Sequence, residues 1–364
     1  MLAARGGADL VALWAQLGSI VEMVAGVALA GIGTGLAVYV ARTRTPDRQR
    51  DLLRESFRLG LAVALPVALL AALIGISFGS GVSGAAALAG WLAVIPGLVN
   101  NYWLGRQRRE RMLALALGTA LLGLLAAALA PQPHVLWYLA ASQALPALIV
   151  FFVGRTSGRP RFRRYSHPLR RYVLPGLAIG ILGPASLLVS RGIVGEGLSW
   201  HEAGVLQALW RLSDWVSGFA AGILSVHFLP RFSALRSSPG LAREMHRAAL
   251  FTLVPALAVF AALFAFHRPL LALLYEADFA ASEGAVALLF AGSLVRIAAW
   301  IPLFALYAMR RTAAISIGEL FSLPLFACLL YLAAGRLTLE VAGGLWLASY
   351  AAYLAFNLLA VRRG

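Results

Sequence analysis

Charged side chains inside long apolar segments are the first candidates for chemistry in this sequence. Arg211, Asp214 and Arg296 lie deep inside apolar runs, and Glu22 and Glu319 lie within two others. A charge in hydrocarbon costs at least about 2.5 kcal/mol on insertion scales, so such residues are by default functional candidates. An arginine guanidinium binds phosphate oxygens through paired hydrogen bonds. Arginines that face a water-filled cavity would therefore suit a ligand with a diphosphate group.

The segment near residues 200–229 carries polar and small residues on one helical face. They recur at three or four positions, a spacing that faces protein or water rather than lipid. The residues of this stripe are Gln207, Arg211, Asp214, Gly218, Gly222 and Ser225. Two interpretations are open: Arg211 and Asp214 neutralise each other, or the stripe lines a cavity. Arg296, an uncompensated cation at similar depth on another segment, favours the cavity.

The other charges allow more than one role. Arg191 lies near the end of an apolar run, where its side chain could reach the membrane surface or face the cavity. Glu319 could pair with a cavity arginine, titrate during ion coupling or reach the interface. Glu22 has no basic partner in its own segment, and a neutral structural carboxyl is the alternative to a coupling role. The candidate substrate-binding residues are Arg191, Gln207, Arg211, Asp214, Arg296 and Glu319.

The elements that position these residues are membrane-spanning helices. The 364 residues are 61% hydrophobic and 13% charged, against roughly 45–50% and about 25% in soluble domains. A soluble fold of this composition would expose large apolar patches. Since a span needs about 20 apolar residues, we predict an all-α polytopic membrane protein with about eleven transmembrane helices. Their expected ranges are 10–40, 53–77, 84–105, 112–130, 134–154, 170–192, 200–229, 244–266, 283–308, 312–334 and 338–361.

The arginines set the expected orientation. All 31 basic residues are arginine, and most of them lie in every second loop or after the last span. Basic loops remain in the cytoplasm, which predicts a cytoplasmic C-terminus and an outer N-terminus in a bacterial inner membrane. An outer N-terminus without a signal peptide is unusual. We therefore expect one helix to be missing before Met1, so that the complete protein has twelve.

A basic, proline-containing stretch at 155–169 divides the chain. We expect residues 1–156 to form an N-terminal helical lobe without its first helix, and 157–364 to form a C-terminal six-helix lobe. The nucleotide-binding loop G-x-x-x-x-G-K-[ST] and the zinc motif H-E-x-x-H are absent from the sequence, and its six histidines are scattered. The sequence therefore predicts no cofactor, no metal site and no enzyme.

Residues 198–235 carry a family resemblance. In the related pattern, S-W-x-E-x-G precedes a span containing Q and S-D that ends in S-V-x-x-L-P-x-x-S. The matching positions here are Ser199, Trp200, Glu202, Gly204, Gln207, Ser213, Asp214, Ser225, Val226, Leu229, Pro230 and Ser233. This stretch resembles Wzx-type flippases of the multidrug/oligosaccharidyl-lipid/polysaccharide (MOP) exporter superfamily, most of all the lipid III flippases of enterobacterial common antigen synthesis.

The resemblance implies two six-helix lobes in a V around a central cavity, alternating between inward and outward openings. Arg191, Asp214, Arg296 and Glu319 fall where the similar sequences carry a like charge, whereas Arg211 does not match. The chain also departs from the pattern in lacking the first helix. Val38 stands where the family pattern leads us to expect a basic residue, so we expect less positive charge from the first lobe.

The function implied is transfer of an undecaprenyl-diphosphate-linked oligosaccharide from the cytoplasmic to the periplasmic leaflet by alternating access. The implied partners are this glycan lipid, membrane lipid, and a glycan polymerase with its chain-length machinery; nucleic acid is not expected. A MATE-like cation or drug antiporter of the same superfamily is the alternative, and it would favour an acidic, aromatic cavity. A membrane-embedded polyprenyl-phosphate glycan enzyme is a third and weaker possibility, because the outer loops are short.

Overall fold

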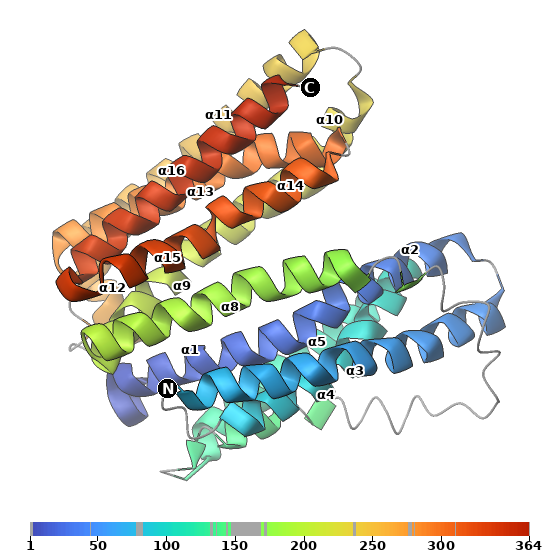
Figure 1. Ribbon diagram of the computed structural model, residues 1–364, viewed down its shortest axis with the longest axis horizontal. Helices are drawn as coiled ribbons and strands as arrows, with labels where there is room; N and C mark the ends of the chain where they lie inside the picture. Colours follow the sequence, from blue (N-terminus) through green and yellow to red (C-terminus); the bar gives the residue numbers. More distant parts are fainter. Residues whose placement is uncertain are drawn as a thin grey trace. The chain divides into compact units, whose positions relative to one another are not determined.

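The computed structural model is helical throughout the part of the chain that it describes (Figure 1). None of these residues lies in a strand, and the prediction of an all-α, polytopic membrane protein is confirmed. The described residues are 3–43, 45–77, 83–131, 134–135, 137–142, 145–146, 169–170, 173–235, 238–275, 279, 281–309 and 311–363.

Eight described helical segments are long and apolar enough to cross a membrane. They are Gly7–Ala41, Pro46–Leu73, Ser83–Gly105, Glu110–Leu129, Gly240–Ala265, Glu283–Ala308, Ala313–Leu332 and Leu339–Arg362. The spans predicted at 170–192 and 200–229 correspond to two further helices of 25 and 24 residues. Most of the span predicted at 134–154 lies outside the described residues. The total of eleven therefore stays a prediction.

The described chain divides into two compact units. Unit 1 comprises Leu13–Leu188, and unit 2 comprises Val189–Gly364 together with the start of the first helix as far as Ala12. The lobe boundary predicted at 156/157 lies outside the described residues and also stays a prediction.

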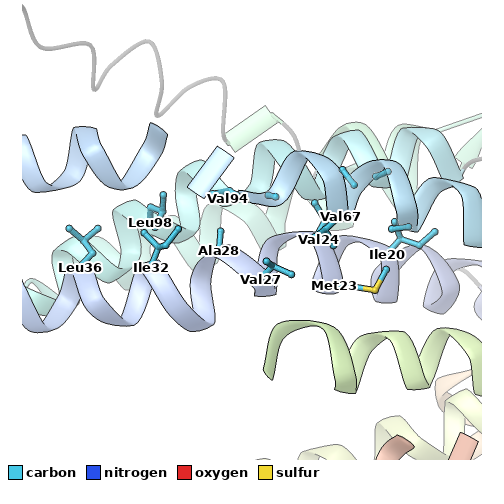
Figure 2. Close-up of a cluster of buried hydrophobic side chains, with 14 of the residues drawn as sticks. Ile20, Met23, Val24, Val27, Ala28, Ile32, Leu36, Val67, Val94 and Leu98 are labelled. Atoms are coloured by element: carbon cyan, nitrogen blue, oxygen red, sulfur yellow. The ribbon is translucent and has the colours of Figure 1, made fainter. Parts of the chain in front are cut away.

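Unit 1 is built around a nearly continuous N-terminal helix. Its elements are α1 (Ala3–Ala28), the π-helical turn η1 (Leu29–Gly33), α2 (Thr34–Arg42), α3 (Pro46–Ser77), α4 (Ser83–Gly105), α5 (Arg109–Leu129) and the first part of α8 (Val173–Gly197). Figure 2 shows apolar side chains from Ile20 to Leu36 in a row along α1, η1 and α2, with Val67, Val94 and Leu98 from α3 and α4. The burial of these side chains forms the core of the unit.

Glycines on α4 allow this close packing. A Cβ added at Gly90 would lie 2.9 Å from the Cα of Val21, and one at Gly105 would lie 2.6 Å from the carbonyl oxygen of Ala37. Any larger residue would push α4 away from the N-terminal helix. Small residues at helix contacts serve the same purpose in membrane proteins generally.

Unit 2 contains the remaining helices, and α13 lies beside α16 within it (Figure 1). Its elements after α8 are α9 (Trp200–Ile223), the π-helical turn η2 (Leu224–Phe228), α10 (Leu229–Ala234), α11 (Ser238–Ala265), α12 (His267–Leu274), α13 (Glu283–Ala308), α14 (Thr312–Gly318), the 3-10 turn η3 (Glu319–Phe321), α15 (Leu323–Leu332), the 3-10 turn η4 (Ala334–Arg336) and α16 (Leu339–Arg362). The segment between the spans predicted at 244–266 and 283–308 thus begins with a short helix, α12.

The span predicted at 312–334 is not one regular helix. α14 ends at Gly318, η3 follows, and α15 begins at Leu323. Pro324 in the first turn of α15 has no backbone N–H, so it cannot continue the hydrogen bonds of the preceding helix. The Ser322 hydroxyl instead donates to the carbonyl oxygen of Glu319 at 2.7 Å. The break places a carboxyl-bearing residue at an irregular point of a membrane helix.

Candidate functional site

Unit 2 contains an ion pair between two of its helices. Arg296 of α13 donates from Nη2 to Asp214 Oδ1 of α9 at 2.8 Å, and the same nitrogen donates to the Ser217 hydroxyl at 2.7 Å. The Arg296 side chain is 10% exposed, whereas that of Asp214 is 45% exposed. A buried cation and a half-exposed carboxylate therefore neutralise each other across α9 and α13.

Aromatic rings surround the Arg296 guanidinium. Its carbon lies 5.4 Å from the ring centre of Trp300, 5.5 Å from that of Trp346 and 5.9 Å from that of Tyr350. Rings at this distance attract a cation through their electron-rich faces. The side chain of Arg296 is thus fixed by aromatic rings as well as by its carboxylate.

A second buried arginine lies beside this cluster. Arg191 of α8 is 5% exposed, and its Nε donates to Gln207 Oε1 of α9 at 2.8 Å. Its guanidinium carbon lies 5.7 Å from the ring centre of Trp210, and that ring lies 5.2 Å from Trp346. Arg191 therefore points into unit 2, and the interpretation in which it extends to the membrane surface is wrong.

The structure also corrects the predicted charge pairing. The interpretation in which Arg211 and Asp214 neutralise each other is wrong, because Asp214 pairs with Arg296 instead. For the same reason, Arg296 is not the uncompensated cation that we expected. Arg211 is exposed on α9, where its charge acts on Tyr275 at the end of α12. Burial raises the pKa of the Tyr275 hydroxyl, and the positive charge of Arg211 opposes this rise.

Glu319 lies in the helix break and is held by hydroxyl groups. The Tyr353 hydroxyl donates to Glu319 Oε1 at 2.8 Å, and the Ser322 hydroxyl donates to Oε2 at 3.3 Å. No arginine in the described part of the chain forms an ion pair with it, so the predicted pairing with a cavity arginine is wrong. Glu319 is therefore a carboxyl at membrane depth without a cationic partner among these residues.

Asn357 has an unsatisfied oxygen close to Gly318, the residue before Glu319. Its side chain is fully buried, and Nδ2 donates to the carbonyl oxygen of Ala299 at 3.3 Å. Its Oδ1 has no hydrogen-bond partner among the described residues. A Cβ added at Gly318 would lie 3.0 Å from that oxygen. Buried unpaired oxygens are uncommon in proteins, so an acceptor is available close to Gly318, one residue before Glu319.

The remaining predicted residues do not join this cluster. Glu22 is exposed on α1 in unit 1. Of the α9 stripe, Gln207 is buried, whereas Gly218 and Gly222 are exposed with Asp214. The side chain of Ser225 is not among those that the structure describes. No group of three or more His, Cys, Asp or Glu residues that could hold a metal occurs in the described part of the chain.

Sequence reasoning missed the aromatic and hydroxyl partners of the charged residues. One face of α16 carries Trp346, Tyr350, Tyr353 and Asn357. Trp346 and Tyr350 contact Arg296, and Tyr353 donates to Glu319. Asn357 lies close to Gly318, the residue before Glu319. Their spacing of three or four residues is that of a single helical face. The spacing could have predicted this face from the sequence. Its aromatic residues, however, are not distinguishable from the ordinary apolar residues of a membrane span.

Part of the 198–235 pattern has a structural explanation. The Ser199 hydroxyl accepts from the backbone N–H of Glu202 at 3.1 Å and so caps α9, as in the S-x-x-E capping box. At Gly204, an added Cβ would overlap the backbone of Ala8. Gln207 and Asp214 are positions of the pattern that bind buried cations, Arg191 and Arg296 respectively. The pattern thus specifies helix capping and close packing as well as the ion pair.

Comparison with known proteins identifies the fold. No family model matches the chain, and no curated protein matches it. Several solved structures do, among them an inward-facing multidrug resistance MATE family transporter of the MOP superfamily, with a TM-score of 0.75, 14% identity and coverage of 100% of this chain and 91% of that one.

The fold is that of MOP-superfamily transporters.

Two further structures agree with this result. A MATE multidrug transporter in complex with rhodamine 6G gives a TM-score of 0.69 at 15% identity, covering 98% of this chain and 88% of that one. A MOP transporter from Pyrococcus furiosus, whose binding pocket is described as reversed in polarity with a different function suggested, gives 0.62 at 14% identity over 100% and 88%. The MOP fold implied by the sequence resemblance is confirmed. The closer resemblance to Wzx-type flippases stays a prediction.

Proposed function

We propose that the chain is a secondary transporter of the MATE type, which exports an amphipathic organic cation in exchange for protons or sodium ions. This was the alternative function expected from the sequence, and it rests first on Glu319. A carboxylate in the membrane that lacks a basic partner requires neutralisation by another cation. A proton, a sodium ion or a cationic substrate can each provide that charge.

The pairing of Arg296 weakens the competing diphosphate hypothesis. That hypothesis needs guanidinium groups that are free to bind phosphate, but Arg296 already has Asp214 and Ser217 as partners. Trp300, Trp346 and Tyr350 surround it. Together these contacts enclose and neutralise the guanidinium, which leaves it poorly suited to a phosphate ligand. The known structures of the same fold include multidrug transporters, one of them with rhodamine 6G bound.

Coupling follows from binding that differs between two conformations. A ligand drives a conformational change only by binding one state more tightly than the other. If the coupling ion and the cationic substrate compete for the carboxylate of Glu319, only one of them binds at a time. Release of the coupling ion on one side of the membrane then allows the substrate to bind, and release of the substrate on the other side allows the ion to bind. The break at Ser322 and Pro324 gives this part of unit 2 a position at which the backbone can move.

The test is uptake of rhodamine 6G into proteoliposomes that carry either a proton or a sodium gradient. Glu319→Gln keeps the size of the side chain and removes its charge, and we expect at least a tenfold loss of gradient-driven uptake. Glu196→Gln, at an exposed position of α8, is the matched control and should transport normally. Gradient-driven uptake by Glu319→Gln at the rate of the wild type would contradict the proposal.

A flippase for undecaprenyl-diphosphate-linked oligosaccharide is the second candidate, favoured by the pattern at 198–235. In this case the expected partners are the glycan lipid and its polymerase, and the cytoplasmic arginine loops would attract the diphosphate before transfer. The test is protein-dependent transfer of a fluorescent polyprenyl-diphosphate glycan between leaflets. Arg296→Ala should abolish the transfer while the protein remains inserted. Transfer by this variant at the wild-type rate would exclude a role of Arg296 in diphosphate binding.

Both candidates place the chain in a bacterial inner membrane with a cytoplasmic C-terminus. This orientation rests on the alternation of basic loops.

A further inference from the structure

A groove runs along the surface of unit 2 between α9 and α11. Two adjoining cavities of about 840 and 290 Å³ share Trp215, Phe219, Ile223 and Phe251 in their walls. Phe219 is 80% exposed and Phe251 is 65% exposed. In a membrane-spanning region, large exposed apolar side chains face the acyl chains of the lipid, so this groove presents an apolar surface to lipid.

Two glycines widen the groove. Gly218 and Gly222 belong to its wall, and no atom lies within 4 Å of a Cβ added at either position. Unlike Gly90 of α4, these glycines are not required for helix packing. They leave a channel along α9 where larger side chains would occupy the space.

A pair of arginines lies beyond one end of this groove. His227 and Phe251 are at that end, with ring centres 6.5 Å apart. Arg231 of α10 lies one helical turn after His227, and Arg247 of α11 lies one helical turn before Phe251. Both arginines are therefore beyond the same end of the groove. The two guanidinium groups bind the same carboxylate, that of Glu244, at 3.2 and 3.3 Å.

The charge of this cluster is not balanced. Two arginines and one glutamate leave one positive charge. The Glu244 side chain is 11% exposed, whereas those of Arg231 and Arg247 are 51% and 64% exposed, so the carboxylate holds the arginines from below. Their outer N–H groups can bind one phosphodiester, whose single negative charge matches the excess.

We propose that this groove binds one anionic phospholipid of the cytoplasmic leaflet, with its phosphate on Arg231 and Arg247 and an acyl chain along Phe219, Ile223 and Phe251. The distance from Arg231 to Trp215 is about 24 Å at 1.5 Å per helical residue. The acyl chains of one leaflet fill a half-thickness of about 15 Å. The groove is therefore long enough for one acyl chain whose phosphate lies at the arginines. Basic pockets between membrane helices are known to bind anionic headgroups. Asp214 also lies in the wall of the larger cavity, whereas Glu319 lines neither cavity, so the proposed lipid site is distinct from the proposed coupling carboxyl.

The experiment measures phosphatidylglycerol binding to the purified, detergent-solubilised protein by native mass spectrometry, with phosphatidylethanolamine as the zwitterionic comparison. We expect one phosphatidylglycerol to bind at least tenfold more tightly than phosphatidylethanolamine. Gly222→Leu, which fills the channel, should weaken this binding at least tenfold. Gly344→Leu on α16 is the matched control, since its added Cβ also meets no atom within 4 Å, and it should bind normally.

The headgroup contact needs its own variants. Arg231→Gln combined with Arg247→Gln would leave Glu244 without a partner, so Glu244→Gln is added to keep the cluster neutral. We expect this triple variant to lose the preference for phosphatidylglycerol, while Arg362→Gln, at an exposed position of α16, retains it. If Gly222→Leu does not fold, Gly218→Leu tests the same channel.

Three results would overturn the proposal. The first is equal binding of the two lipids, and the second is unchanged phosphatidylglycerol binding in the folded channel variant. The third is displacement of the lipid by rhodamine 6G at equal concentration, which would instead make the groove a substrate site.

Discussion

Arg296 and Asp214 are 82 positions apart in the chain, yet their side chains meet at 2.8 Å inside unit 2. The two ends of this ion pair lie in different surroundings, because Arg296 is 10% exposed and Asp214 is 45% exposed. The loss of either residue therefore has different consequences. Removal of the carboxylate leaves a buried cation, whereas removal of the cation leaves a carboxylate that water can reach.

We expect Asp214→Asn to lower the free energy of unfolding by about 2–3 kcal/mol, somewhat less than the loss of a partner from a fully buried pair. Arg296→Gln should cost less, about 1–2 kcal/mol, because an exposed carboxylate remains hydrated. The double variant should be more stable than the sum of the two losses predicts. Denaturant unfolding in detergent micelles measures all three variants. Strictly additive losses would show that the pair contributes no coupling.

Tyr353→Phe removes one of the two hydroxyl groups that hold Glu319. Its effect on stability should stay near 1 kcal/mol, the usual net value of one hydrogen bond. We expect a larger effect on gradient-driven transport, since the carboxyl loses its fixed orientation. Tyr331→Phe, at a side chain that is 71% exposed, serves as the control. Equal transport by both variants would remove Tyr353 from the coupling site.

Gly180→Ala should destabilise unit 1. A Cβ at this position would overlap the backbone of Gly26 and Val27, so α1 and α8 would have to move apart. Gly118→Ala on α5 adds the same methyl group where no atom lies within 4 Å. That variant should be stabilised by about 0.5–1 kcal/mol, the usual gain of alanine over glycine in a helix. The two thermal midpoints should therefore shift in opposite directions, and a parallel shift would contradict the packing argument.

Arg191→Lys tests whether a charge alone satisfies the second buried site. The guanidinium of Arg191 both donates to Gln207 and lies over the ring of Trp210, and an ammonium cannot reproduce this planar contact. We expect a loss of about 1–2 kcal/mol in the free energy of unfolding. Wild-type stability of Arg191→Lys would mean that position and charge are sufficient.

The proposed orientation can be tested by cysteine labelling in a Cys328→Ser background, which removes the one native thiol. Arg362→Cys, at the end of α16, should react with a membrane-impermeant maleimide only after the cells are opened. Glu283→Cys, at the start of α13, should react in intact spheroplasts. The reverse pattern would place the basic loops outside.

The sequence predicted the spans well because hydrocarbon imposes one requirement on every helix. Apolar runs of sufficient length identified the eight spanning helices. The break at Glu319 was not predicted, although Pro324 lies within the span predicted at 312–334. A proline can bend a helix or end it, and here α14 ends at Gly318 and α15 begins at Leu323.

The charged residues of the site were found from depth alone, but their partners were not. Arg211 is closer to Asp214 in sequence than Arg296 is, so a local pair was one of the two open interpretations. The pair that forms depends on which face of α13 packs against α9, and apolar periodicity does not fix that rotation in helices that are hydrophobic on most faces. The same uncertainty hid the α16 face that contacts Arg296 and Glu319.

The separation of Arg296 and Asp214 along the chain also affects the biogenesis of the protein. At about 5–20 residues per second, the ribosome adds the 82 residues between them in about 4–16 s. During this interval α9 has entered the translocon with a carboxylate whose partner has not yet been made. Asp214 then awaits α13 as a docking point, and its charge lowers the cost of inserting a helix that carries Arg296. Membrane insertion of α13 should therefore depend on α9, although α13 is long and apolar enough to span by itself.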